Sequence, residues 1–311
     1  MVSIIIPCYN TEHTLAKCLQ TLLEQNYHNW EAICVNDGSL DSTEEILNRF
    51  SRLDNRIKVF TQKNLGAAKA RELGVQKAIG EFITFLDADD TFTPDTLTTA
   101  LQHFNTETDI VVFSFNIINN DKTIKCKKTK PNYLLSISYL KKVLSGQYGW
   151  ELWAKIYRKN IFYSPITVPS DIRIGEDAAI FIQLVCKAKY IRIINKPLYN
   201  YIQYSNSASH IQSTKYAEET LKSAYFINNH LIKFSFYKDI KNEISAMFLL
   251  FYSNSTRKAY LDKNNLLIQD LKRHLRFSAL IKLPALKAIY ICLSYFCFQK
   301  VHSHYLSLRA K

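Results

Sequence analysis

The sequence lacks the patterns by which cysteines usually build a disulfide framework or a zinc site. Its seven cysteines are odd in number and scattered, and no pair of them has the C-x-x-C spacing. Disulfide-rich secreted domains and structural zinc sites both depend on such regular spacing. We therefore expect neither, and we expect a protein of a reducing compartment.

Long apolar runs and a leader are missing as well. No stretch reaches the roughly 18 apolar residues that a membrane-spanning helix requires. Met1 leads directly into VSIII, without the basic region and the cleavage site of a signal peptide. We expect no signal peptide and no spanning helix, and hence a cytoplasmic protein.

Acidic residues become scarce toward the end of the chain. The first 100 residues hold 14 acidic and 9 basic residues, whereas residues 271–311 hold eight Lys or Arg and no Asp or Glu. The length of 311 residues and the 47% hydrophobic content suffice for one large α/β domain and an extension. No nucleic-acid recognition motif accompanies the basic charge, so we expect no nucleic-acid partner.

The first third of the chain alternates short apolar runs with helical periods. The runs predict strands, several of them apolar on both faces as in a parallel sheet covered by helices, at residues 2–7, 30–36, 57–61, 81–87 and 109–115. Apolar stripes predict helices between them, and Thr93 before Pro94 predicts the N-cap of a further helix. This order indicates a doubly wound α/β sheet. The lysine-rich residues 122–130 are predicted to be a solvated loop.

Polar side chains follow three of these strands. They stand in PCYN at residues 7–10, NDGS at residues 36–39 and DADD at residues 87–90. Ligands of open parallel sheets bind outside the carboxyl ends of the strands, so we expect Asp37, Asp87 and Asp89 to lie near one edge. Carboxylates that face one another repel unless a cation or a proton intervenes. A hard divalent metal, Mg²⁺ or Mn²⁺, shared with substrate phosphates is the simplest explanation.

Four motifs in this order resemble the inverting family 2 glycosyltransferases of GT-A fold. They are VSIIIPCYN, VNDGS, N-x-G-A-A-x-A-R and GEFITFLDADD. The resemblance implies a catalytic domain over residues 1–212, with a donor half at 1–108 and an acceptor half at 109–212. A basic helical extension would follow at 213–311. It implies transfer of a hexose or N-acetylhexosamine, with inversion, from a nucleotide sugar, taken as UDP-linked, to a saccharide or lipid-linked saccharide acceptor. Lipopolysaccharide, capsule or surface-glycan synthesis would be the setting.

The resemblance also assigns roles to residues. Asp89 would be the principal metal ligand, and Asp87 would lie near the ribose or the metal. The remaining donor contacts would come from Pro7, Tyr9, Asn10, Asp37, Gly38, Ser39, Arg71 and Ala88. The sequence IGEDAAIF matches the family's E-D motif, which makes Asp177 the base and Glu176 its neighbour. The sequence departs from the family pattern in two places: Glu72 replaces an asparagine, and Ile202 and Gln203 stand where an arginine is usual.

Each assignment has a structural alternative. Asp37 could cap the helix after NDGS, and Glu176 and Asp177 could be first-turn acids. Arg71 and Lys69 could lie on a solvated helix face. Tyr9, Trp150 and Trp153 could be packing residues, for the two tryptophans in place of stacking on sugar rings. Asp90 is expected to be structural, bonded to the turn before Thr93.

Two rival functions also remain open. FLDADDT matches the D-x-D-x-[TV] loop of haloacid-dehalogenase-type phosphatases, although that loop normally follows the first strand of its sheet. A non-catalytic carbohydrate-binding relative would keep the fold without the reaction. In the basic tail, the apolar run at residues 288–298 suits either a helix on an anionic membrane surface, at the inner face of the cytoplasmic membrane, or a helix packed on the catalytic domain.

Overall fold

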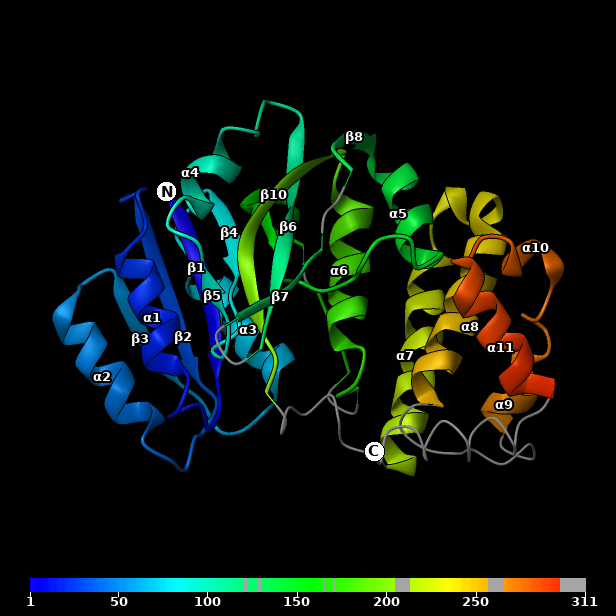
Figure 1. Ribbon diagram of the computed structural model, residues 1–311, viewed down its shortest axis with the longest axis horizontal. Coiled ribbons are helices and arrows are strands. Elements are labelled where there is room, and N and C mark those ends of the chain that lie inside the picture. Colours follow the sequence, from blue (N-terminus) through cyan, green and yellow to red (C-terminus); the bar gives the residue numbers. More distant parts are fainter. Residues whose placement is uncertain are drawn as a thin grey trace. The chain divides into compact units, whose positions relative to one another are not determined.

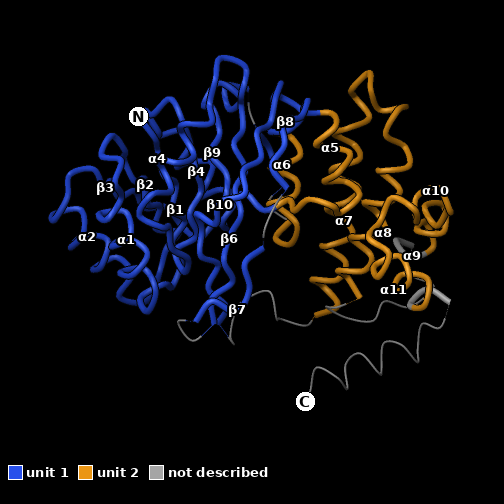
Figure 2. The backbone as a smooth tube through the Cα atoms, turned by 45° about the horizontal axis from the view of Figure 1, so that its top comes forward, with its two compact units in different colours: residues 1–136, 151–170, 184–205 blue, residues 137–150, 171–183, 206–311 orange. Residues whose placement is uncertain are grey.

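The computed structural model describes residues 1–119, 122–127, 130–164, 166–169, 172–204, 213–256 and 266–296 (Figure 1). Helix positions 266–268 and 294–296 are described as backbone only. The chain forms two compact units, coloured separately in Figure 2. Unit 1 contains residues 1–136, 151–170 and 184–205, and unit 2 contains residues 137–150, 171–183 and 206–311.

Unit 1 is built on one sheet, which has ten strands within the described part of the chain. Its order is β3-β2-β1-β4-β9-β6-β10-β5, with β7 paired to β6 and β8 paired to β10. The strands are β1 (Val2–Cys8), β2 (Trp30–Asn36), β3 (Ile57–Thr61), β4 (Phe82–Phe85), β5 (Thr91–Phe92), β6 (Thr108–Asn119), β7 (Lys122–Lys127), β8 (Asn132–Leu135), β9 (Lys155–Arg158) and β10 (Tyr190–Ile202).

The first four strands of this order are parallel, as the apolar runs predict. β1 pairs in parallel with β2 and with β4, and β2 pairs in parallel with β3. β9 is antiparallel to both β4 and β6, while β10 runs parallel to β6. All five predicted strands are present, and the doubly wound α/β fold is confirmed.

Helices cover both faces of this sheet. Ile4, Ile6 and Cys8 of β1 belong to the core that α1 (Leu15–Leu23) and α2 (Thr43–Leu53) complete on one face. Ile5 points to the other face, where α3 (Ala67–Lys77) packs on β1 and β2. A Cβ at Gly74 of α3 would overlap the Ile5 side chain, so this glycine allows the close approach of helix and strand.

Two local predictions are wrong. Thr93 is not a helix cap, because α4 spans Thr96–Leu101 with Asp95 at its N-cap position. Thr93 directly follows β5, which pairs with β10, and its N–H donates to the carbonyl of Leu198 of β10 at 3.2 Å. The predicted loop at 122–130 contains β7, an exposed strand paired antiparallel with β6. Strand pairing therefore overrides both local signals.

The described residues of unit 2 form helices and the loops between them. Its later helices are α7 (Thr214–Leu231), the 3-10 helix η3 (Ser235–Ile240), α8 (Lys241–Ser255), α9 (Leu266–Leu271), α10 (Phe277–Leu280) and α11 (Ala285–Phe296). Every residue from Glu243 to Ser253 of α8 is buried, and α7, α9, α10 and α11 all pack on this helix. A helix that is covered all round forms the centre of such a bundle. Among the described helices, none combines the length and apolar character needed to cross a bilayer.

Two further helices, α5 (Ser136–Leu144) and α6 (Glu176–Lys187), each contain residues assigned to both units. α6 begins with the predicted E-D motif. The 3-10 helix η1 (Lys159–Phe162) lies within unit 1. The predicted domain boundary at residue 212 stays a prediction.

Candidate active site

The polar clusters after β1, β2 and β4 lie at the same edge of the sheet. Cys8, the last residue of β1, is opposite Asn36, the last residue of β2, and the N–H of Asp37 donates to the carbonyl of Cys8 at 2.8 Å. On the other side of β1, the N–H of Leu86 donates to Ile5 at 3.0 Å, directly before the DADD turn. We call this the carboxyl edge. Three elements far apart in the sequence thus present polar groups together.

Asn10 ties the loop after β1 to the loop after β2. Its side-chain Oδ1 accepts the N–H of Leu40 at 2.9 Å, and its own N–H donates to Oγ of Ser39 at 3.1 Å. Asn10 has φ +50°, a left-handed conformation that asparagine tolerates better than most residues. Asn10 and Ser39 are both predicted to contact the nucleotide sugar, and these hydrogen bonds fix the two residues relative to each other.

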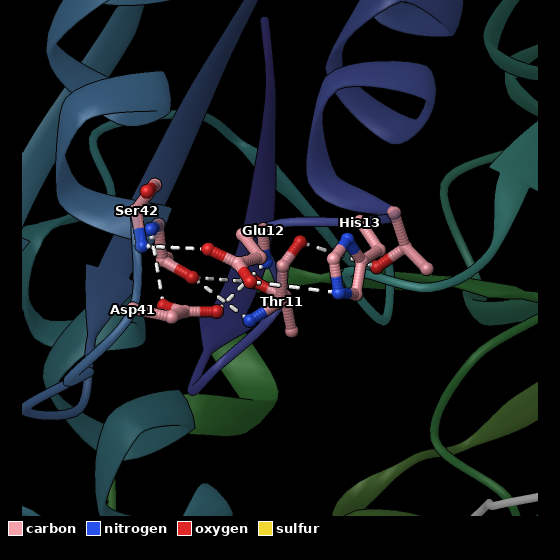
Figure 3. Close-up of polar contacts among 7 residues, drawn as sticks. Thr11, Glu12, His13, Asp41 and Ser42 are labelled. Atoms are coloured by element: carbon pink, nitrogen blue, oxygen red, sulfur yellow. Dashed lines mark hydrogen bonds and ion pairs between the residues drawn. The ribbon is translucent and has the colours of Figure 1, made fainter.

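Hydrogen bonds between Glu12 and the residues Asp41 and Ser42 join the same two loops a second time (Figure 3). The N–H of Glu12 donates to the Asp41 carboxylate at 3.0 Å, and the N–H of Ser42 donates to the Glu12 carboxylate at 3.0 Å. The other Asp41 oxygen accepts the N–H of Thr43 at 3.0 Å, at the first residue of α2. These reciprocal bonds fix one side of the carboxyl edge without using Asp37, so Asp41 and not Asp37 bonds the start of α2.

Asp37 is buried and holds the loop that leads into α3. One oxygen accepts from Nε2 of Gln62 at 2.7 Å and from the N–H of Leu65 at 2.9 Å, and the other accepts from the N–H of Gly66 at 2.9 Å. The alternative that Asp37 caps α2 is therefore wrong. An ionised carboxylate has about four acceptor positions, so one remains for a ligand. Its nucleotide role stays a prediction.

Gly38 follows Asp37 with φ +72°, and a Cβ at this position would lie 3.0 Å from the N atom of Asn64. The turn after β2 therefore requires glycine for its backbone conformation and for its close approach to the loop before α3. Pro7 at the end of β1 is half-buried, and Tyr9 beside it is 45% exposed. The alternative that Tyr9 is an ordinary core residue is thus wrong, and its ring faces solvent at the carboxyl edge.

Arg71 of α3 pairs with the first carboxylate of the DADD turn. Its Nη2 atom lies 2.9 Å from Oδ1 of Asp87, and the arginine side chain is only 7% exposed. The alternative of a solvated face is therefore wrong for Arg71. Lys69, by contrast, is partly exposed and pairs with Glu72 at 2.7 Å. The structure thus places Arg71, and not Lys69, at the carboxyl edge.

The surroundings of Asp89 disfavour its charged form. Burial, followed by the neighbouring charge of Asp87, raises the pKa of Asp89 from 3.8 to about 6, and Arg71 offsets only part of this. Ala88 between the two aspartates is buried. The carboxylates of Asp87 and Asp89 flank this residue, so they repel each other at neutral pH unless a cation binds between them.

The donor atoms at this turn suit a hard cation that brings ligands of its own. Within the described residues, no three His, Cys, Asp or Glu side chains are grouped so that they could hold a metal ion without other help. Mg²⁺ and Mn²⁺ sites commonly use one or two carboxylates together with substrate phosphates. Asp87 and Asp89 fit that arrangement and do not fit a closed all-protein site.

Asp90 is structural, but its partners differ from those expected. It is buried, and its carboxylate accepts the hydroxyl of Tyr199 at 2.6 Å and the N–H of Ile202 at 2.8 Å, both from β10. The Tyr199 hydroxyl also accepts the N–H of Asp87 at 3.4 Å. The DADD turn is therefore fastened to β10, and not to the turn before Thr93.

Tyr199 belongs to a stack of three aromatic rings beside this turn. Trp153 lies between Tyr199 and Tyr201, at centroid distances of 4.8 Å and 5.4 Å and interplanar angles of 15° and 7°. The pKa of Tyr201 is raised, first by burial and then by the charges of Asp90, Asp89 and Asp87. Packing is therefore the role that the structure shows for Trp153, and Trp150 likewise packs on Phe251 at 4.9 Å.

We predict that Tyr199→Phe destabilises the protein by about 1 to 3 kcal/mol, since it leaves a buried carboxylate oxygen of Asp90 without its donor. Urea unfolding of the wild type and the variant measures the difference. Tyr201→Phe is the matched control, because it removes a hydroxyl from the same strand, and it should change stability by less than about 0.5 kcal/mol. Equal effects of the two substitutions would refute the anchoring role of Tyr199.

Glu176 and Asp177 form the first turn of α6, on the part of this helix that belongs to unit 2. Gly175 before them has φ +87°, and a Cβ there would lie 2.9 Å from Cβ of Ser223 in α7. The Ser223 hydroxyl donates to the carbonyl of Ile174. α7 therefore braces the turn that carries both carboxylates. Their position agrees with the first-turn alternative and leaves the catalytic assignment open.

Comparison with known proteins defines the class of this chain. Residues 3–167 match the model of "Glycosyl transferase family 2", which is more than half of the sequence. The chain therefore belongs to glycosyl transferase family 2. This agrees with the resemblance carried by the four motifs and with the sheet described above.

Relatives of this chain include bacterial glycosyltransferases. The "Putative glycosyltransferase EpsH" of Bacillus subtilis is 30% identical over 210 residues, which are 64% of this chain and 60% of that protein. "Glycosyltransferase GlyG" of Streptococcus pneumoniae is 30% identical over 219 residues, which are 67% of this chain and 72% of that protein. The match to "Glycosyltransferase GlyA" of Streptococcus pneumoniae takes in only 32% of that longer protein.

Solved structures share the fold. "S. aureus TarS 1-349 in complex with UDP-GlcNAc" has a TM-score of 0.73 at 18% identity, covering 98% of this chain and 91% of that chain. "Mannosyltransferase PcManGT from Pyrobaculum calidifontis in complex with GDP-Man and Mn2+" has a TM-score of 0.52 at 15% identity, covering 96% and 87%. At these identities the similarity establishes the GT-A fold.

Proposed function

We propose that this protein transfers a hexose or N-acetylhexosamine from a UDP-linked sugar to a saccharide acceptor, with inversion at the anomeric carbon. The observation that carries the proposal is the convergence of Asp37, Asp87 and Asp89 at the carboxyl edge of a family 2 sheet. Tyr9 offers an exposed ring for the base at the same edge. UDP is favoured over GDP because the TarS structure with UDP-GlcNAc resembles this chain more, with a TM-score of 0.73, than the PcManGT structure with GDP-Man does, with a TM-score of 0.52.

Asp89 and Asp87 would hold Mn²⁺ or Mg²⁺ against the donor diphosphate. When bound, the metal neutralises the negative charge that develops on the leaving nucleoside diphosphate. The protein's own part is to fix both carboxylates beforehand: Arg71 orients Asp87, and the Asp90–Tyr199 pair holds the turn. A fixed turn need not reorganise as charge develops, which is how preorganised sites lower barriers.

Asp177 would accept the proton of the attacking acceptor hydroxyl, with Glu176 beside it. Inversion requires that this hydroxyl attack the face opposite the leaving diphosphate, so its base belongs to a different element from the metal ligands. The start of α6 is such an element. Gly175 and Ser223 would keep the turn in the conformation that presents the carboxylates.

The acceptor is proposed to be a saccharide or lipid-linked saccharide of lipopolysaccharide, capsule or another surface glycan. The enzyme would act at the inner face of the cytoplasmic membrane. The support is the C-terminal segment 271–311, which has eight basic and no acidic residues and therefore suits an anionic surface.

The test is to incubate the purified protein with a panel of nucleotide sugars and Mn²⁺ and to measure nucleoside diphosphate release. We expect slow release from one UDP sugar, faster release with the matching acceptor, and a product of inverted anomeric configuration by NMR. A phosphatase would release inorganic phosphate from phosphomonoesters. That alternative is disfavoured because DADD follows β4 and not the first strand. Release of neither product would support a non-catalytic relative and refute the proposal.

A further inference from the structure

The segment that contains α10 and α11 carries large apolar side chains that no described residue covers. Each of them is at least half exposed: Phe277, Ile281, Leu286, Ile289 and Leu293. We call these five residues the apolar face. In α11 they stand at positions i, i+3 and i+7, which places them on one side of a helix. Contiguous exposed apolar residues of this kind mark a surface that contacts something other than water.

The opposite side of the same helices is packed in the ordinary way. Ala279, Leu283 and Ile291 are buried, and α10 and α11 both pack on α8. The hydroxyls of Tyr290 and Thr256 lie 3.1 Å apart, and Lys282 pairs with Glu243 of α8 at 3.0 Å. The helices therefore have a defined inner side. Of the two predicted roles for this segment, packing explains the inner side and leaves the apolar face unexplained.

Basic side chains adjoin the apolar face. Lys272, Arg273 and Arg276 are exposed and lie within the five residues before Phe277. Arg273 pairs with Asp270 at 2.8 Å, and Asp270 is the last acidic residue in the sequence. Exposed cations beside exposed apolar residues form the combination by which helices lie in an anionic lipid surface. Each cation near such a surface contributes on its own, so a cluster of them matters.

A second copy of this chain fits the face less well. In a two-fold contact the same patch lies on both sides, so the interface would contain two copies of the cluster Lys272, Arg273 and Arg276. Two clusters of like charge in one interface oppose association. Residues 297–311, which lie outside the described residues, carry three more basic and no acidic residues in the sequence. They too lack the charge that would neutralise the cluster.

We propose that the apolar face and the adjoining Lys272, Arg273 and Arg276 form the surface by which this protein seats itself on an anionic lipid bilayer. The apolar side chains enter the headgroup region while the cations pair with lipid phosphates. The proposal rests on the proposed function in one respect: binding to the bilayer would bring the enzyme to a lipid-linked acceptor. The binding itself is independent of the reaction.

The test is flotation of the full chain with vesicles of phosphatidylcholine and phosphatidylglycerol in equal amounts, with pure phosphatidylcholine vesicles as the reference. We expect the wild type to bind the anionic vesicles, and Leu286→Ser/Ile289→Ser to bind them at least about tenfold more weakly. The matched control is Leu53→Ser/Ile79→Ser, whose apolar side chains are 68% and 65% exposed elsewhere in the chain, and it should bind as the wild type does.

Charge is tested separately. Lys272→Gln/Arg276→Gln should weaken binding to the anionic vesicles, whereas Lys233→Gln/Lys238→Gln, at other exposed positions, should not. Raising the salt concentration from about 0.1 M to about 1 M should release the wild type, because the Debye length falls from about 10 Å to about 3 Å. Slow donor hydrolysis without vesicles should be the same in the wild type and in all variants. Wild-type protein that binds the vesicles but hydrolyses no donor would count against the proposed function and not against this surface.

Three results would overturn the proposal. One is wild-type protein that ignores anionic vesicles, and another is full binding by Leu286→Ser/Ile289→Ser. The third is a wild-type dimer in light scattering that becomes a monomer in Leu286→Ser/Ile289→Ser, which would show that the face joins two copies of the chain.

Discussion

Asp89→Ala is expected to reduce glycosyl transfer on the order of 10³-fold or more, because it removes the carboxylate that would bind the metal on the leaving diphosphate. EDTA should abolish the activity of the wild type, and added Mn²⁺ or Mg²⁺ should restore it. Excess metal should not rescue the variant, since its ligand is gone. Initial rates of nucleoside diphosphate release with and without metal measure all three effects.

Asp239→Ala is the matched control, because Asp239 is an exposed aspartate of η3. It should transfer sugar at the wild-type rate and respond to EDTA as the wild type does. Asp89→Ala also relieves the repulsion from Asp87, so the variant should be at least as stable as the wild type in urea. An active Asp89→Ala enzyme would remove the metal site from this turn.

Asp177→Asn is expected to lower turnover by about 10² to 10⁴, the usual contribution of a general base. The amide keeps the size of the side chain but cannot accept the proton of the acceptor hydroxyl. Because Asp177 is proposed to act on the acceptor, the affinity for the UDP sugar should stay near the wild-type value. Steady-state kcat with saturating acceptor, together with calorimetric donor binding, separates the two quantities.

Glu176→Gln is the natural comparison for this prediction. If Asp177 is the base, Glu176→Gln should lower kcat much less than Asp177→Asn. The reverse order would exchange the two roles. If both variants keep the wild-type kcat, the acids only stabilise the first turn of α6, as first-turn carboxylates commonly do.

The fold of the donor half could be predicted from the sequence because its signals are local. β1 and β2 are buried along nearly their whole length, so continuous apolar runs identify them. Five strands were missed: β5, β7, β8, β9 and β10. Of these, β5, β8 and β9 are short and β10 is interrupted by polar residues, and all four pair with partners far away in the chain. Such pairing leaves little trace in a local pattern.

The candidate site likewise combines features that local sequence signals predict with features that depend on contacts between distant residues. Motif spacing places Asp37, Asp87 and Asp89 at one edge, because parallel strands align their carboxyl ends. The groups that hold this edge in place come from distant positions in the sequence. Gln62 and Gly66 donate hydrogen bonds to Asp37, and Tyr199, which is 109 positions after Asp90, donates one to Asp90. Only the structure shows that Tyr199 anchors the metal-binding turn that we propose.

Gly175 illustrates what a single sequence leaves undecided. A glycine before the two acids of α6 reads as an ordinary helix start, and its local pattern does not distinguish a flexible turn from a fixed one. The contact with Ser223, 48 positions further on in the sequence, shows that no side chain fits there without displacing α7 or the turn. The requirement for glycine is therefore a property of packing in unit 2.

Calorimetric titration of UDP into the purified protein, with Mn²⁺ and then with EDTA, tests the central claim most directly. If Asp89 and Asp87 share a metal with the diphosphate, each ligand must strengthen the binding of the other, by linkage. We predict that UDP binds at least about tenfold more tightly with Mn²⁺ than with EDTA, and that Asp89→Ala removes the difference. Equal UDP affinity under both conditions in the wild type would contradict a metal-bridged nucleotide site at the DADD turn.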